Sequence, residues 1–403
     1  MRQPIRVGTE FQPTVIQERR SAMRDRKLPD HVSCWLAGPL PSDCRVALQR
    51  LATADDVVHV AVMPDVHLVE EVCNGVAVAT TDLIYPQAVG GDIGCGIVAV
   101  AADSTAEPLE DELVSRRVLD RLSEQIPGNR HPAVTAAAEL PDDLSCERLS
   151  NDRLTKLAER DGRVQLGTLG RGNHFVELQR DDDSQLWVMI HSGSRGIGQA
   201  ISQWHLDRAR QASRQRLVCV SASNDAGQQY LHDMAWARRY ASANRRAMLR
   251  AVEKVLSDVT GCRLDWASLI ETDHDHLIRE QHFGRDLWVH RKGAQPASLD
   301  QLGLIPGSMG TRSYLVRGRG CAESLNSSSH GAGRALPRSI ARQQIGQRQL
   351  IREMHGVWFD DHRSDQLRDE APSAYKDVQT VLRAQRDLTA IVRELRPMLV
   401  YKR

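Results

Sequence analysis

Metal-binding types of side chain recur in five short motifs spread over much of this 403-residue chain. The first combines aspartate and cysteine on a glycine loop, and the other four carry histidine: Asp92-Ile-Gly-Cys95-Gly96, Asn173-His174, His191-Ser-Gly-Ser-Arg195, Asp273-His274-Asp275 and Ser329-His330-Gly-Ala-Gly-Arg334. A domain boundary anywhere between residues 92 and 330 would divide these residues between two units. The pattern therefore predicts one large domain whose topology gathers distant segments at one site.

The glycine loop around Asp92 and Cys95 is the strongest of these signals. Its carboxylate and thiol are three residues apart and can turn onto one ion. Aspartate, cysteine and imidazole together suit a borderline divalent cation such as manganese or zinc. A cysteine alone would more often be a small buried apolar residue. Because histidines follow, we predict that both residues are ligands.

Three histidines complete the predicted metal site. His174 follows a glycine-rich turn, and His191 ends the apolar strand 186–190. His274 lies in the run Asp273-His-Asp275-His, which would also suit a solvated loop. We predict His174, His191 and His274 as ligands, with Asp273 or Asp275 orienting His274.

His330 carries a different signal, because glycines stand at the next position and at the third. They keep side-chain bulk away from the imidazole, as a nucleophile that meets a phosphorus centre requires. Arg334, Arg338 and Arg342 recur every four residues, and Pro337 suits an early helix position. On a helix these arginines would share one face, which is either a track for phosphates or a solvated basic face.

Composition sets the remaining limits. Hydrophobic residues make up 41 % and charged residues 26 %, as in globular proteins, and the net charge of +1 does not itself indicate nucleic acid. The 8 cysteines form no Cys-x-x-Cys pair, so neither a disulfide framework nor a zinc ribbon is expected. No signal peptide and no apolar run of membrane-spanning length, about 18 residues, is found, so we expect a cytoplasmic protein.

The order of apolar segments predicts an α+β fold. We expect strands over 57–63, 75–80, 83–89, 163–178 and 186–191. We expect helices within 107–160 (including 109–125), over 228–256, and from Pro372 to just before Pro397.

Nine segments in order give the chain an extended resemblance to the RtcB-type RNA-splicing ligases. They are Met63–His67, Val89–Gly96, Leu166–Phe175, Ile190–Gly196, Arg291–Ala294, Ile305–Gly310, Ser329–Arg334, Ala374–Asp377 and Tyr401-Lys402. The resemblance implies a single α+β catalytic domain, residues 1–403, with mixed sheets around a deep metal pocket.

The chemistry that the resemblance implies is specific. The family joins RNA ending in a 2′,3′-cyclic phosphate or 3′-phosphate to RNA with a 5′-hydroxyl, using GTP and two Mn²⁺ ions. His330 would carry GMP, which passes to the RNA 3′-phosphate before the 5′-hydroxyl displaces it. Asp92, Cys95, His174, His191 and His274 would hold the ions, and Asp65 would position the 5′-hydroxyl.

Matching positions also imply binding residues. Asn173 and Glu177 carry groups that a purine edge or a ribose can use. The nucleotide site implied by the resemblance comprises Asn173, His174, Phe175, Val176, Glu177, His274, Asp275, Pro306, Gly307, Ser308, Met309, Ser313, His330, Gly331, Ala332, Gly333 and Lys402. RNA or phosphate would be bound by Arg195, Arg334 and Arg338.

Three departures from the family pattern concern substrate range and rate. Leu68-Val-Glu-Glu71 replaces a glycine-rich stretch and places negative charge where RNA would pass. Asp273–His276 stands where many members have His-His-Asn-Tyr, and Ala335-Leu-Pro337 replaces a segment that commonly has serine. None of them removes a predicted ligand or the nucleophile.

Two rival functions remain open. One is a paralog that senses broken RNA ends and ligates poorly, which the departures favour and the intact His330 opposes. The other is a metal-dependent phosphatase or cyclic phosphodiesterase, which would not need Lys402 or the His330 loop. The expected partners are broken RNA, such as tRNA halves, and GTP, for a monomer without membrane contact; an activating protein is an optional partner.

Overall fold

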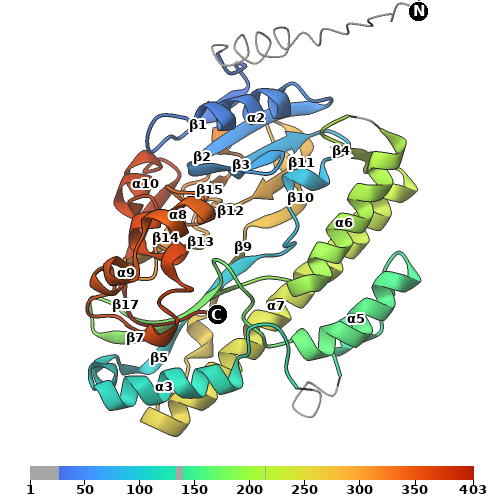
Figure 1. Cartoon of the computed structure of the whole chain (residues 1–403). Helices are drawn as coiled ribbons and strands as arrows, with labels where there is room; N and C mark the ends of the chain where they lie inside the picture. The colour runs from blue at the N-terminus through green and yellow to red at the C-terminus, as the bar shows by residue number, and fades with distance from the viewer. Residues whose placement is uncertain (1–26, 133–138, 214) are drawn as a thin grey trace, which may run out of the picture.

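The computed structural model describes residues 27–132, 139–213 and 215–403. Two main sheets lie one above the other in Figure 1, and a small two-stranded sheet lies between them. The five-stranded sheet has the order β1-β2-β3-β11-β10. Its strands are β1 (Val32–Cys34), β2 (Val57–Val69), β3 (Val72–Thr80), β11 (Arg285–Lys292) and β10 (Asp275–His282). β1 pairs parallel with β2 while the other neighbours are antiparallel, so the sheet is mixed.

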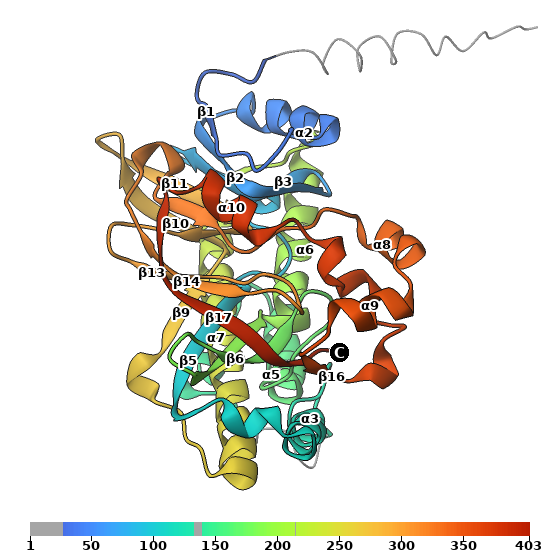
Figure 2. The ribbon, with the colours of Figure 1, turned by 90° about the vertical axis from the view of Figure 1, so that its left-hand side faces the viewer.

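The larger sheet has the order β13-β14-β17-β6-β7-β5-β9, and a short strand, β16, adds to β17. Its strands are β13 (Leu302–Ile305), β14 (Ser313–Gly318), β17 (Thr389–Tyr401), β6 (Phe175–Arg180), β7 (Gln185–Ser192), β5 (Gly96–Thr105), β9 (Ile270–Asp273) and β16 (Trp358–Phe359). Figure 2 shows the long strand β17 beside β6 and β14. The small sheets are β12 (Ala294–Pro296) with β15 (Ser327–Ser329), and β4 (Leu83–Ile84) with β8 (Val220–Ser221).

Helices cover the outer faces of these sheets (Figure 1). They are α2 (Ser42–Ala52), α3 (Glu112–Gln125), α4 (Asp142–Ser145), α5 (Asp152–Gln165), α6 (Arg195–Ala212), α7 (Asp225–Thr260), α8 (Arg338–Gln344), α9 (Gln347–Glu353) and α10 (Val378–Ala384). Single 3₁₀ turns occur at Pro86–Ala88, Glu107–Glu110, Trp266–Ser268, Ala322–Ser324, Asp361–Arg363, Arg368–Glu370 and Pro372–Ala374. No helix in the described part of the chain is both long and apolar enough to cross a membrane.

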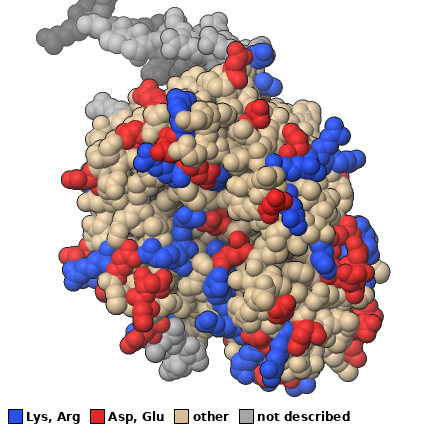
Figure 3. Space-filling view, turned by 180° about the vertical axis from the view of Figure 1, so that it is seen from behind, with Lys and Arg blue, Asp and Glu red and all other residues tan. Residues whose placement is uncertain are grey.

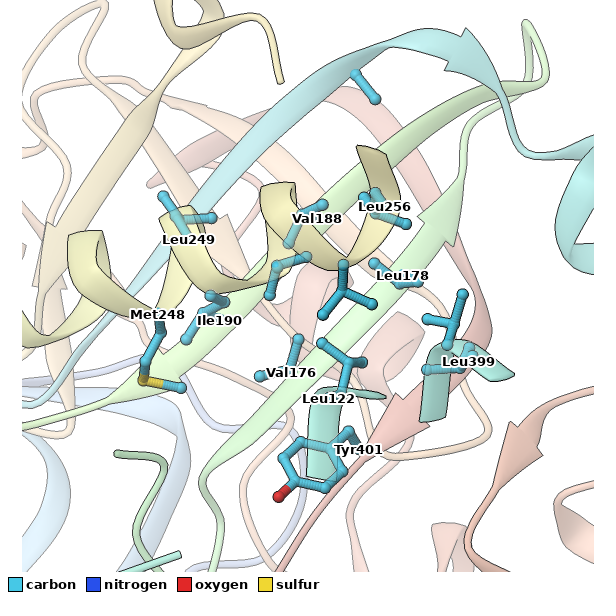
Figure 4. Close-up of a cluster of buried hydrophobic side chains, with 14 of the residues drawn as sticks. Leu122, Val176, Leu178, Val188, Ile190, Met248, Leu249, Leu256, Leu399 and Tyr401 are labelled. Atoms are coloured by element: carbon cyan, nitrogen blue, oxygen red, sulfur yellow. The ribbon is translucent and has the colours of Figure 1, made fainter. Parts of the chain in front are cut away.

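The long helix α7 anchors the larger sheet. Asn224 caps its first turn by accepting a hydrogen bond from the Gly227 amide, and Gly261 ends it with a left-handed φ of 77°. Its apolar stripe packs against β6, β7, α3 and the end of β17 in the cluster of Figure 4. Each buried side chain of this size contributes about 1.5–3 kcal/mol. The cluster therefore holds the strands that carry the site in fixed register.

Several sequence predictions are confirmed by these elements. The helix expected over 228–256 is α7, and the segment 109–125 contains α3. The strand expected over 57–63 continues as β2 to Val69, through a register shift between Val62 and His67 that accommodates Pro64. The described cysteines are all free, as expected. Part of the expected helical region, residues 133–138, lies outside the described residues.

The helix predicted from Pro372 is wrong. Pro372 opens a 3₁₀ turn, α10 spans only seven residues, and Thr389–Tyr401 forms β17. This strand pairs on both sides, with β14 and β6, so tertiary pairing outweighs the helical spacing of its apolar residues. Pro397 has no amide hydrogen and lies at a register shift, where the ladder does not require one.

Two expected strands are also shorter than predicted. Residues 163–165 belong to helix α5, and β6 begins only at Phe175. Of residues 83–89, only Leu83 and Ile84 are extended, because the chain turns into a 3₁₀ helix at Pro86.

Candidate active site

The predicted metal ligands lie at neighbouring strand ends of the larger sheet. Asp92 and Cys95 lie in the loop that leads into β5, and His174 immediately precedes β6. His191 is the second-to-last residue of β7. His274 separates β9 from β10. In the ladder, Ile97 pairs with His191, which pairs on its other side with Phe175, while Gly96 pairs with Asp273. The sheet register therefore brings five residues from four motifs together.

The side-chain atoms converge as a metal site requires. The sulfur of Cys95 lies 3.4 Å from Nε2 of His174 and 3.3 Å from Nε2 of His191. Nε2 of His191 lies 3.0 Å from Nε2 of His274, and Nε2 of His174 lies 3.1 Å from Oδ2 of Asp92. The ligand atoms of Cys95, His174 and His191 all lie within 4.8 Å of one another. This donor set fits a borderline divalent cation.

The far side of each imidazole is fixed by an acceptor. Nδ1 of His174 lies 3.0 Å from the Leu169 carbonyl oxygen, and Nδ1 of His191 lies 3.2 Å from that of Asn173. Nδ1 of His274 lies 3.3 Å from Oδ1 of Asp275. A proton on each Nδ1 leaves the three Nε2 lone pairs directed at the centre.

Burial supports the same protonation states. It lowers the pKa values of His191 and His274, with charge from neighbouring histidines adding to the shift of His191, so both rings favour the neutral form that binds metal. Burial and the charge of Asp92 raise the pKa of the Cys95 thiol. Gly193 makes room beside Asp92, since a Cβ at residue 193 would lie 2.4 Å from Oδ1 of that carboxylate.

His330 lies beside this centre with a partner of its own. It follows β15, and its ring centroid is 4.5 Å from that of His274. Its Nδ1 lies 2.7 Å from Oδ2 of Asp65, a fully buried residue on β2. Burial lowers the pKa of His330. The hydrogen bond and charge of Asp65 and the charge of Asp275 have the larger, opposite effect, so the pKa lies above its usual value. Asp65 thus orients the imidazole through Nδ1, and the Gly293 backbone is a further hydrogen-bond partner of the ring.

A cavity of about 900 Å³ opens onto His330. Much of the predicted nucleotide site lines it: Asn173, Phe175, Glu177, Pro306, Gly307, Ser308, Met309, Gly331, Ala332, Gly333 and Lys402. Val176 instead lies in the hydrophobic core of Figure 4, and its backbone is paired with Ile190 and Tyr401 on either side, so it does not line the cavity. Ser313 lies beneath the lining, where its hydroxyl accepts hydrogen bonds from Gln179 and the Gly307 amide.

Glu177 and Lys402 place a carboxyl group and an ammonium group in this cavity. Burial raises the pKa of Glu177 to about 8, against the lowering effects of a hydrogen bond from Gln179 and the charge of Lys402. The ammonium of Lys402 lies 2.7 Å from Glu370 and 5.8 Å from the ring centre of Phe175. An acceptor carboxyl, an aromatic ring and an ammonium group together suit a planar base.

Residues 47–403 match the family model described as "tRNA-splicing ligase RtcB". The chain belongs to the RtcB family. It is 35 % identical to the RNA-splicing ligase RtcB of Escherichia coli (strain K12), over 92 % of this chain and 97 % of that protein. It is 31 % identical to the RNA-splicing ligase RtcB of Mycobacterium tuberculosis, over 83 % and 94 %. The tRNA-splicing ligase RtcB of Thermococcus kodakarensis is 28 % identical, over 80 % and 83 %.

The arginines of this RtcB-family chain do not form the free helical track that their spacing suggested. Arg334 precedes α8, so the three arginines do not share one helix face. Instead they converge on two buried carboxylates. Arg334 and Arg338 pair with Glu370, and Arg338 and Arg342 pair with Asp369.

Glu370 is a residue that the motif reading missed. Its carboxylate also lies 2.7 Å from Lys402 and accepts a hydrogen bond of 2.7 Å from the Tyr375 hydroxyl. Burial opposes its charge, but Lys402, Arg338 and Arg334 lower the pKa of Glu370 to about 2. This cluster contains two carboxylates, Asp369 and Glu370, and four cations, Arg334, Arg338, Arg342 and Lys402. The cations outnumber the carboxylates, so the cluster keeps excess positive charge beside the cavity. The only signal for Glu370 in the sequence was its place in the acidic pair Asp369-Glu370, just before the motif Ala374–Asp377.

Arg195, the remaining predicted phosphate ligand, begins α6 in a left-handed conformation with φ of 59°. Its guanidinium lies 3.2 Å from Nδ1 of His174 and 3.3 Å from the Thr168 hydroxyl. It does not line the main cavity, but it lies beside His174, a predicted metal ligand.

Two acidic residues in the departures from the RtcB pattern, Glu71 and Asp273, pair with nearby basic groups, whereas Glu70 is exposed at the turn after β2. Glu71 pairs with Arg50 at 3.2 Å and also with Arg216. Asp273 does not orient His274; it pairs with Arg238 at 2.6 Å and with Nδ1 of His276 at 3.1 Å. Acidic and basic side chains are likewise interspersed over the face in Figure 3. Neither sign of charge therefore dominates this face.

Proposed function

We propose that this chain is an RNA ligase that uses GTP and Mn²⁺ to join a 3′-phosphate or 2′,3′-cyclic phosphate end to a 5′-hydroxyl end through a histidine–GMP intermediate. One observation carries the proposal. His330 is oriented by Asp65 beside the metal ligand His274, in the same cavity as Glu177 and Lys402.

Asp65 prepares His330 for nucleophilic attack. With the Nδ1 proton donated to the carboxylate, the lone pair on Nε2 is the nucleophile. Attack on the α-phosphorus of GTP forms a P–N bond and breaks the P–O bond to pyrophosphate, which departs with the electron pair. The family resemblance also suggested that Asp65 positions the 5′-hydroxyl. In this mechanism Asp65 would do so in a later step of the reaction.

Glu177 and Lys402 give the cavity a preference for guanine. The N1–H and 2-amino groups of guanine are donors that a carboxylate accepts, and O6 is an acceptor for an ammonium group. Adenine has a donor where guanine has O6 and lacks the 2-amino group. Phe175 supplies an apolar face for the base.

Asp92, Cys95, His174, His191 and His274 would hold the metal. Two manganese ions would neutralise charge on the attacking and leaving oxygens of an in-line displacement. The neutral imidazoles and the adjacent thiol and carboxylate supply both hard and soft donors, as this borderline ion accepts.

The remaining steps transfer the guanylyl group. For an end with a 2′,3′-cyclic phosphate, water would first add to phosphorus and break the bond to O2′, which leaves a 3′-phosphate and a 2′-hydroxyl. The RNA 3′-phosphate then attacks the phosphorus bound to His330, which releases the imidazole and forms a P–O–P bond. The 5′-hydroxyl then attacks the RNA phosphorus, GMP leaves, and a phosphodiester forms. Arg334 and Arg338 line the cavity and would bind these phosphates, with Arg195 beside His174.

The proposed partners are broken RNA ends and GTP, for a cytoplasmic monomer. The ion pairs of Glu71 and Asp273 remove two of the three charges that favoured an end-sensing paralog, which leaves only exposed Glu70 in its favour. A phosphatase would leave Glu177 and Lys402 without a role.

Incubation with α-labelled GTP and Mn²⁺ tests the proposal. We expect acid-labile, alkali-stable radioactivity on the protein, which is lost when RNA with a 3′-phosphate is added. Release of inorganic phosphate from RNA ends without any labelled protein would favour the phosphatase.

A further inference from the structure

An apolar loop lines a part of the cavity that has no role in the proposed ligase mechanism. Its six residues, Leu36-Ala-Gly-Pro-Leu-Pro41, connect β1 to α2. Connecting loops at a surface are ordinarily rich in polar turn residues. Pro39 and Pro41 are exposed, and Leu36 and Leu40 are only partly buried against the core below. The loop therefore leaves apolar surface open to the cavity.

Leu68 extends this surface from a second element. It lies on β2, lines the same cavity, and keeps 36 % of its surface exposed. None of these seven side chains can donate or accept a hydrogen bond. We call the loop 36–41 together with Leu68 the apolar wall.

The apolar wall is held in place before any ligand binds. The amide of Trp35 donates to the Val62 carbonyl oxygen at 2.9 Å, and its indole N–H donates to Asp387 at 2.8 Å. At the other end, the Arg45 amide donates to the Pro41 carbonyl oxygen at 2.9 Å. The two prolines fix further backbone angles. Contact with a preformed surface costs little ordering entropy.

The position of the wall indicates which ligand it meets. The wall belongs to the layer of the five-stranded sheet, whereas Phe175 and Glu177 belong to the larger sheet. His330 follows β15, which lies between the two sheets in Figure 1. In an in-line displacement the attacking and leaving groups lie on opposite sides of phosphorus. With GMP leaving on the Glu177 side, the attacking 5′-hydroxyl strand lies on the side of the wall.

We propose that the apolar wall is a subsite for the terminal nucleobase of the 5′-hydroxyl RNA strand; this rests on the proposed ligase function. The flat face of any base can pack on leucine and proline, while its phosphate stays near the cations of the cavity. Since the side chains of the wall have no hydrogen-bonding groups, they can pack on adenine, guanine, cytosine and uracil alike. The ligase can then accept many broken ends and still fix the attacking nucleotide.

A substrate–protein cycle tests this subsite. Ligation is measured with a 5′-hydroxyl RNA whose terminal nucleotide is intact or abasic, using wild type and Leu68→Ala. In wild type, loss of the base should lower kcat/KM about tenfold, within the range for one stacked base. Leu68→Ala should lower kcat/KM for intact RNA severalfold. In this variant, removal of the terminal base should lower kcat/KM by a much smaller factor than in wild type. Labelling of the protein by GTP should not change.

Two controls make the result specific. Leu113→Ala, at a 78 % exposed leucine of α3 outside the cavity lining, should behave as wild type with both strands. An abasic terminal nucleotide on the 3′-phosphate strand should give the same loss in wild type and Leu68→Ala.

Three outcomes would overturn the subsite: equal rates for intact and abasic 5′-hydroxyl strands, fully additive effects of the two changes, or coupling of Leu68 to the 3′-phosphate strand. If wild type failed to ligate at all, the proposed function would fail separately. Fluorescence anisotropy of a labelled 5′-hydroxyl oligonucleotide, intact against abasic, would then still decide whether the wall binds a base.

Discussion

Nδ1 of His330 lies 2.7 Å from Oδ2 of Asp65, and the two residues come from segments 265 positions apart that meet between the two main sheets. In the proposed mechanism, this contact leaves Nε2 as the ring nitrogen that attacks phosphorus. A second histidine–carboxylate pair, His205 and Asp233 at 2.8 Å, is buried outside the cavity lining and offers a matched comparison.

Asp65→Asn should slow formation of the protein–GMP adduct by about a hundredfold or more, because an amide can hold the imidazole in the wrong tautomer. GTP affinity should change by less than about threefold, since Asp65 does not belong to the predicted base-binding set. Rapid-quench measurement of labelled GMP transfer checks this. Asp233→Asn should lower thermal stability without slowing the transfer, and equal slowing in both variants would make Asp65 a merely structural residue.

Cys95→Ala should lower manganese occupancy and ligation together, because the thiol lies beside the imidazoles of His174 and His191 and a thiol ligand has no close substitute there. Cys262→Ala provides the control, since that buried cysteine lies in the hydrophobic cluster under α7. Metal content after gel filtration is measured by mass spectrometry. Full manganese content and ligation in Cys95→Ala would make Cys95 an ordinary core residue.

Glu177 should release a proton when guanine nucleotide binds near pH 7. In the free protein its pKa is raised to about 8, chiefly by burial, so the carboxyl is mostly protonated at pH 7. Donors from the base stabilise the carboxylate and lower that pKa in the complex. Affinity for GTP should therefore rise with pH up to about 8 and then level off.

Calorimetry in buffers of different ionisation enthalpy measures this proton directly. We expect release of up to one proton per GTP at pH 7, less at pH 9, and none attributable to this group in Glu177→Gln. Proton uptake on binding, or unchanged release in Glu177→Gln, would exclude Glu177 as the acceptor.

Arg338→Ala should weaken RNA binding by a similar factor for all end sequences, because phosphate contacts carry no base information. It should also reduce the dependence of binding on salt by about one contact. Arg342→Ala is the control, because that arginine pairs with Asp369 but does not line the cavity. A loss that depended on end sequence, with an unchanged salt slope, would indicate base recognition.

The predicted ligand set depends mostly on local signals: Asp92 and Cys95 stand next to glycines, His174 follows a glycine-rich turn, and His191 ends an apolar strand. His274 has only its acidic neighbours as a local signal. The long helix α7 was predictable for the same reason, since its caps and apolar spacing are local. β17 was not, because its strand conformation depends on pairing with β14 and β6, which come from distant parts of the chain.

The carboxylates behind the site were harder to predict than the ligands. Glu370 acts through Lys402, Tyr375 and the arginines, and nothing in its local sequence shows that these groups converge. The same holds for Glu71, whose charge looked unfavourable for RNA until Arg50 and Arg216 were found beside it. Pairings between distant segments decide such roles.

The identity of His330 as the covalent nucleophile is tested most directly by intact-mass analysis after incubation with GTP and Mn²⁺. Wild type should gain the mass of one GMP, and the adduct should map to the peptide that contains His330. His330→Ala should keep its manganese and its GTP binding with modest loss, yet gain no GMP and ligate nothing. A GMP adduct on a lysine, or ligation that survives in His330→Ala, would contradict the account.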